Sequence, residues 1–180
     1  MRKVLAIVFG LMVMAAPALA QVPAGNVFFG YSYNRADTFV VGRSGGTNLN
    51  GWEGSLEGKI FPYVGIVADI GAQYGAQDTG LGRVTGAVHS YIFGPRVSFS
   101  VSHFRPYAHF LFGIAHESND SIVPGLSHSD TAFADAIGGG IDYKLIPAVA
   151  WRVQADVLQT RFFSDTQNDF RFSTGIVVNF

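Results

Sequence analysis

The sequence contains no cysteine, so neither a disulfide framework nor a thiolate metal site can hold its fold. Charged residues make up only 14% of the chain and form no basic run, which argues against a nucleic-acid partner. After residue 20, no stretch is long and apolar enough for a membrane helix. A chain with these absences must be held together by backbone pairing and burial.

The first 20 residues have the pattern of a secretory signal peptide. A basic start at Arg2 and Lys3 is followed by an apolar run that ends in a small-residue cleavage site, Ala18-Leu19-Ala20. An uncleaved anchor is the alternative, but the run is short for a bilayer and no basic flank follows it. We therefore expect residues 1–20 to be removed and residues 21–180 to form one exported domain. Without Arg2 and Lys3, ten basic residues face 13 acidic ones, a net charge near −3.

Strand formers dominate what remains. The 22 glycines and the 14% of aromatic residues favour strands and turns over helices. Eight regularly spaced segments have about the 9–11 residues that a tilted membrane strand needs. These segments are 26–35, 50–61, 64–75, 84–99, 106–116, 132–145, 150–162 and 168–180. Longer polar connections, expected to be loops at one end, are 36–49, 76–83, 117–131 and 163–167. The other connections are short turns.

Apolar and polar residues alternate along each clear strand, so parity assigns each side chain to one face. This alternation also suits a soluble barrel of the lipocalin or avidin kind, with its apolar face inside. The polar face mixes charges with glycine and serine, however, as a narrow lumen requires. Because buried charges persist only when paired, the inward charges should balance. The expected lumen ion-pair network is Glu53, Glu57, Asp69, Asp142 and Asp156 against Lys59, Arg96, Lys144, Arg152 and Arg171.

The chain ends on a strand whose apolar face includes Ile176, Val178 and Phe180. With the segments Tyr91-Ile-Phe-Gly-Pro-Arg96 and Gly138-Gly-Gly-Ile-Asp142-Tyr143, this ending resembles the eight-stranded outer-membrane β-barrel family of the OmpA/OmpX type. The resemblance implies an all-β fold, an eight-stranded antiparallel up-and-down transmembrane β-barrel. It also implies export through the periplasm to the outer membrane, where the assembly machinery reads the final strand as an assembly signal. No peptidoglycan-binding domain is expected after the barrel.

No residue pattern points to catalysis, a metal or a cofactor. The five histidines are dispersed, and no HExxH or Walker pattern is present. Ser127-His128-Ser129-Asp130 and His89-Ser90 invite comparison with outer-membrane lipid A deacylases, but adjacent strand residues point to opposite faces. Aromatic residues near the strand ends are expected to form girdles at the two membrane interfaces. Those residues are Trp52, Tyr63, Tyr107, Tyr143, Trp151 and Phe162.

Function follows from the expected geometry. Eight strands enclose a lumen just wide enough for side chains to fill. The leading hypothesis is a monomeric, non-enzymatic outer-membrane barrel with a structural envelope role and surface contacts through four loops. Its partners would be outer-membrane lipid, lipopolysaccharide and the barrel assembly machinery. One alternative is a narrow small-molecule channel or ligand-binding barrel, in which glycines leave a passage. A lipid-modifying enzyme is the third. The glycines in question are Gly65, Gly71, Gly138 and Gly140.

Overall fold

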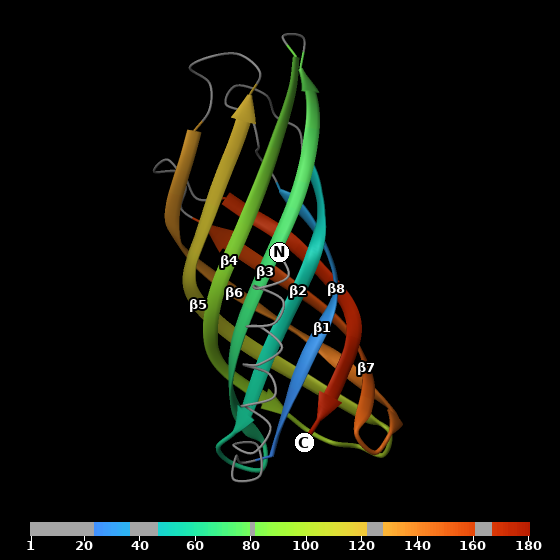
Figure 1. Ribbon diagram of the computed structural model, residues 1–180. Helices are drawn as coiled ribbons and strands as arrows, with labels where there is room; N and C mark the ends of the chain where they lie inside the picture. Colours follow the sequence, from blue (N-terminus) through green and yellow to red (C-terminus); the bar gives the residue numbers. More distant parts are fainter. Residues whose placement is uncertain (1–23, 37–46, 80–81, 122–127, 161–166) are drawn as a thin grey trace, which may run out of the picture.

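The computed structural model describes residues 24–36, 47–79, 82–121, 128–160 and 167–180. Their eight strands form a closed antiparallel barrel (Figure 1) in which each strand pairs with its sequence neighbours. The strands are β1 (Gly25–Ala36), β2 (Thr47–Lys59), β3 (Val64–Thr79), β4 (Gly82–Ser98), β5 (Phe104–Ser121), β6 (His128–Ile146), β7 (Val149–Thr160) and β8 (Gln167–Asn179). The predicted all-β, up-and-down barrel is confirmed. No helix in these ranges is long and apolar enough to cross a membrane.

The first and last strands close the barrel. Strand β1 pairs with β8 from Asn26 opposite Asn179 to Arg35 opposite Phe170. At the very end, the N–H of Gly25 donates to the carbonyl of Phe180 and the N–H of Phe180 donates to the carbonyl of Gly25, both at 3.0 Å. Closure satisfies the backbone groups that an open sheet would leave at its edges. The aromatic C-terminal residue is therefore part of the seam.

The two ends of the barrel differ. The carboxyl terminus and the short turns, at residues 60–63, 99–103 and 147–148, lie at one end (Figure 1). At the other end, β3 to β6 continue well beyond the remaining strands (Figure 1). The loops predicted at 76–83 and 117–131 are too long, because a polar composition does not distinguish loop residues from the polar ends of paired strands. Residues 76–79, 82–83, 117–121 and 128–131 are paired strand. In these segments the strands remain paired through their backbones although neither face is apolar.

Some sequence predictions fall outside the described residues. The signal peptide, residues 1–20, is one of them, as are most of the first loop, the last loop up to residue 166 and the girdle residue Phe162. The eight predicted strands agree with the structure in number and order, and most of their boundaries differ from the observed ones by a few residues.

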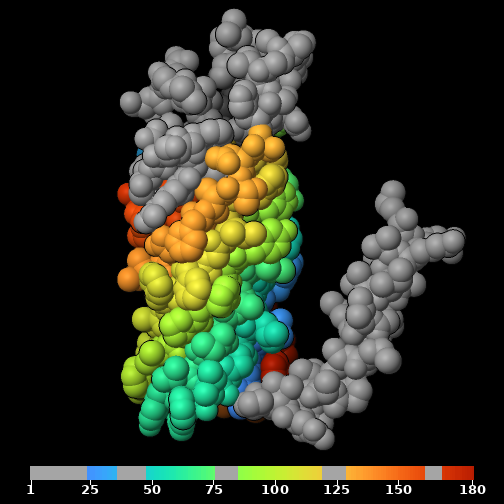
Figure 2. Space-filling view, turned by 90° about the vertical axis from the view of Figure 1, so that its left-hand side faces the viewer, coloured from blue at the N-terminus to red at the C-terminus, as the bar shows by residue number. Residues whose placement is uncertain are grey.

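The outer wall of the barrel is apolar. On β7, Trp151 and Val157 are 48% and 44% exposed, whereas Arg152 and Asp156 between them are buried. Exposed large apolar side chains continue around the wall, which Figure 2 shows as an unbroken surface over β3 to β6. Examples from five strands are Phe29, Ile70, Phe93, Phe110 and Ile137. A soluble barrel has the opposite arrangement, so the surrounding medium must be apolar.

Part of the lumen is also apolar. Leu111 on β5, Ala136 on β6 and Leu158 on β7 lie opposite one another in the register and are fully buried. Leu111 and Leu158 are each one inward position further from the short turns than His109 on β5 and Asp156 on β7. This cluster includes Val67, Ile92, Ala115, Ala132 and Ala134. It packs next to the charged part of the lumen.

Candidate functional site: the lumen and its mouth

The charged residues predicted for the lumen are fully buried inside it with two exceptions. Lys59 is half-buried at the turn end, with its side chain 16% exposed, and Lys144 is exposed. The eight fully buried ones are Glu53, Glu57, Asp69, Arg96, Asp142, Arg152, Asp156 and Arg171. Three arginines are among the largest fully buried side chains of the barrel. Burial on this scale requires charge pairing and hydrogen bonding for every group.

Arg171 on β8 is the centre of an inner node, which comprises Arg171, Glu53, Asp69 and Asp156. Its Nη1 lies 3.0 Å from Oδ1 of Asp69 and its Nη2 lies 2.8 Å from Oδ2 of Asp156. The Nε atom is 3.5 Å from Oε2 of Glu53, to which the Ser173 hydroxyl also donates. One guanidinium thus joins carboxylates from β2, β3 and β7. The planar fork of arginine, with five donors, suits this task.

Four cations and two carboxylates make up an outer node nearer the short turns: Lys59, Arg96, Arg105, Arg152, Glu57 and Asp142. Glu57 pairs with Lys59 at 3.0 Å and with Arg96 at 3.2 Å. Asp142 accepts from Arg152 at 2.6 Å and from Arg105 at 2.9 Å. Because these partners lie on β2, β4, β5, β6 and β7, the node ties the wall together across the lumen.

Arg105, and not the predicted Lys144, is one of the cations of the lumen ion-pair network. Arg105 precedes the strand predicted at 106–116, but β5 begins at Phe104, so Arg105 takes an inward position at the mouth. Lys144 has inward parity, yet it stands at the end of β6, next to the register irregularity between Lys144 and Ile146. No ion pair found among the described residues includes Lys144. The pattern showed which face Lys144 belongs to, but not how far along the barrel it lies.

Tyr107 is a lumen residue, so its assignment to an aromatic girdle was wrong. Its ring lies beneath two guanidinium groups, with the Cζ of Arg96 at 4.3 Å and that of Arg152 at 4.8 Å from the ring centroid. Its hydroxyl donates to Oε1 of Gln154 at 2.5 Å. Cation–π contacts of this kind strengthen when water is excluded. Nearness to a strand end suggested a girdle, but the inward parity of Tyr107 was the better signal.

His109 and Gln154 connect the two nodes. Nη2 of Arg96 lies 3.2 Å from Nδ1 of His109, and Nε2 of His109 lies 2.8 Å from Oδ1 of Asp156. Because arginine can only donate, Nδ1 of His109 is the acceptor in the contact with Arg96. Gln154 donates from Nε2 to both Glu53 and Asp156, each at 2.8 Å. The polar lumen is therefore one connected network.

The charges of the two nodes are opposite. Three carboxylates surround Arg171 in the inner node, so its formal charge is −2. In the outer node, four cations face Glu57 and Asp142, which leaves +2. The formal charges of the ten groups sum to zero. Attraction between the nodes adds to the pairing within each, because a low-dielectric interior screens charge weakly.

The four glycines considered for a passage are packed against neighbours. A Cβ on Gly65 would lie 2.8 Å from Oε1 of Glu57, and one on Gly71 would lie 2.9 Å from the Ser90 hydroxyl. On Gly138 it would meet Oδ1 of Asp156 at 2.2 Å, and on Gly140 the Tyr107 hydroxyl at 2.7 Å. These glycines make room for long side chains that cross the lumen.

The residues considered for hydrolysis are separated. Ser90 is fully buried in the lumen, whereas His89 lies on the other face of β4 and its ring meets that of Tyr74 at 6.0 Å. His128 begins β6, and Ser127 lies outside the described residues. Across the described ranges, no group of three or more histidine, aspartate or glutamate residues is arranged to hold a metal ion.

Sequence comparison agrees with this architecture. A family profile described as the outer membrane protein beta-barrel domain matches residues 6–180. The chain belongs to the outer-membrane β-barrel family. Its site of action is accordingly the outer membrane, and in barrels of this family the short turns face the periplasm. The mouth beside the turns is therefore the periplasmic mouth.

Solved structures of similar barrels share the fold at low sequence identity. Neisserial surface protein A is 13% identical, with 87% of this chain and 99% of that chain covered and a TM-score of 0.71. Ail of Yersinia pestis is 15% identical, with 89% and 100% covered and a TM-score of 0.64. The N-terminal β-barrel domain of Pseudomonas aeruginosa OprF is 18% identical, with 87% and 99% covered and a TM-score of 0.55. No curated protein matches the chain significantly.

Proposed function

We propose that this protein is a monomeric, non-enzymatic outer-membrane barrel with a closed lumen, which reinforces the envelope and makes surface contacts through its extracellular loops. The observation that carries the closed lumen is the burial of Arg96, Arg152 and Arg171, of which no more than 1% is exposed. A water-filled channel would wet the side chains that line it. Outer-membrane lipid, lipopolysaccharide and the assembly machinery are the proposed partners.

A ligand-binding role at the outer surface is the second candidate. Ail was crystallised in complex with the heparin analogue sucrose octasulfate, and that barrel has a TM-score of 0.62 to this one. The extended strands β3 to β6 place their polar ends beyond the shorter strands at the extracellular end. A lipid-modifying enzyme is the third candidate, and the lipid A of cells with and without the protein would test it.

Planar bilayers test the closed lumen directly. We expect no stepwise conductance from the purified wild-type barrel, because the ion-paired side chains and the apolar cluster leave no continuous water path. Correct folding of the sample should be established by its altered migration in unheated detergent gels. Frequent, reproducible channel openings would contradict the closed lumen and would favour the small-molecule channel.

The final strand is proposed to be the assembly signal, with Ile176, Val178 and Phe180 as its apolar residues. Phe180→Asp should lower the amount of folded barrel in cells several-fold, while folding of the purified chain into vesicles should change little. A charge near the membrane interface costs about 0–1 kcal/mol, so stability alone cannot explain a large loss. Asn179→Asp carries the same charge on the other face and serves as the control. Equal amounts of the two variants in the outer membrane would refute the signal.

A further inference from the structure

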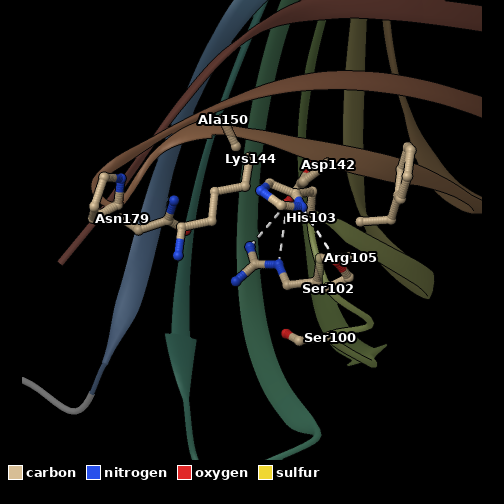
Figure 3. A pocket seen from close by; sticks show the side chains of 10 residues that line it. Ser100, Ser102, His103, Arg105, Asp142, Lys144, Ala150 and Asn179 are labelled. Atoms are coloured by element: carbon tan, nitrogen blue, oxygen red, sulfur yellow. Dashed lines mark hydrogen bonds and ion pairs between the residues drawn. The ribbon is translucent and has the colours of Figure 1, made fainter.

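We propose that the periplasmic mouth of the lumen binds a small oxyanion, a phosphate or carboxylate group carried by a periplasmic solute. A cavity of about 290 Å³ opens there between the β4–β5 turn and the ends of β6, β7 and β8 (Figure 3). The residues of its lining that bear on binding are Ser100, Ser102, His103, Arg105, Asp142 and Lys144. This volume is at the lower end for ligand pockets and suits a small solute.

The first argument is the charge around the cavity. The outer node, of which Arg105 and Asp142 line the cavity, has a formal surplus of two positive charges, and exposed Lys144 adds a third beside the opening. The compensating negative charge belongs to the inner node, deeper in the lumen. A concave site with walls of low dielectric focuses such a surplus and concentrates small anions.

Free donors are the second argument. Arg105 uses Nε and Nη2 on Oδ2 of Asp142, at 3.2 and 2.9 Å, as the dashed lines in Figure 3 show. Among the described residues, no hydrogen bond or ion pair engages Nη1 of Arg105 or the ammonium group of Lys144. Both side chains come from different strands and line the same cavity. A guanidinium edge with a nearby ammonium is well suited to an oxyanion.

The acidic residue in the lining does not oppose this binding. Asp142 is buried, and Arg152 approaches its Oδ1 and Oδ2 at 2.6 and 3.0 Å. Arg105 takes a further position on the same carboxylate. The charge of the Asp142 carboxylate is thus neutralised by Arg152 and Arg105. The hydroxyl of Ser100 adds a neutral donor at the rim, while that of Ser102 lies 3.1 Å from Nδ1 of His103.

The test uses the purified barrel in a non-ionic detergent. Sodium phosphate and sodium citrate are titrated separately at constant ionic strength, with sodium chloride as the reference, and binding is followed by calorimetry and by the NMR signals of Lys144 and Arg105. We expect saturable one-to-one binding of at least one probe. The preferred probe identifies the group as phosphate or carboxylate.

Two variants locate the site. Lys144→Gln should weaken the preferred probe about tenfold, since a hydrogen bond to a charged group contributes that much. Arg35→Gln removes an exposed arginine at the opposite end of β1 and should leave affinity unchanged. Arg105→Lys retains the charge but loses the planar guanidinium with its paired N–H donors, and should also weaken binding. Absence of saturable binding, or equal weakening by Arg35→Gln, would overturn the site without affecting the closed lumen.

Discussion

Replacing Arg171 by methionine should lower the free energy of unfolding by about 3–5 kcal/mol, the cost of leaving a buried ionic group without its partner. The guanidinium of Arg171 is shared by Glu53, Asp69 and Asp156, all buried, so its loss leaves three carboxylates close together. Methionine keeps most of the side-chain volume. The effect therefore measures charge pairing rather than a cavity.

Denaturant titration of the barrel in lipid vesicles can measure this loss, with the fluorescence of Trp52 and Trp151 as the signal. Arg35→Met, at an exposed position, is the matched control and should change stability by less than about 0.5 kcal/mol. Adding Asp69→Leu to Arg171→Met should recover part of the loss, because one unpaired charge is removed. Equal, small effects of Arg171→Met and Arg35→Met would mean that water reaches the network, as in a channel.

Gly138→Val should prevent folding or destabilise the barrel by at least about 3 kcal/mol, the upper range for overpacking. A Cβ at Gly138 would lie 2.2 Å from Oδ1 of Asp156 and 2.4 Å from the carbonyl oxygen of Ala155. The carbonyl belongs to the backbone and cannot rotate away. Movement of Asp156 would also release His109 and Arg171, so steric and electrostatic losses add.

Gly58→Val provides the control for Gly138→Val. Nothing lies within 4 Å of a Cβ built on Gly58, and this residue shares the outward face of β2 with Leu56. We expect normal folding, with a stability change within about 0.5 kcal/mol. Migration in unheated gels and denaturant titration should separate the two variants clearly. If Gly138→Val folded as well as Gly58→Val, the lumen would be packed more loosely than the structure indicates.

Local patterns in the sequence determine much of the barrel. Alternation with a period of two assigns each residue to a face without knowledge of its neighbours, because successive side chains on a strand point in opposite directions. This is why residues as distant as Glu53 and Arg171 could both be assigned to the lumen. Regular spacing predicted the number of strands, and the excess of apolar residues on one face agreed with a membrane-facing wall.

Pairing partners and axial positions were decided only by the tertiary structure. Arg171 meets Asp69 across 102 residues of sequence, and its position relative to Asp69 depends on the register of every strand between them. Parity determines whether a side chain points inward, but strand stagger determines its height in the lumen. For this reason Arg105 is part of the network, while Lys144, with the same inward parity, is exposed at the mouth. The lengths of β3 to β6 have a similar origin, since backbone pairing can continue through polar residues that carry no hydrophobic signal.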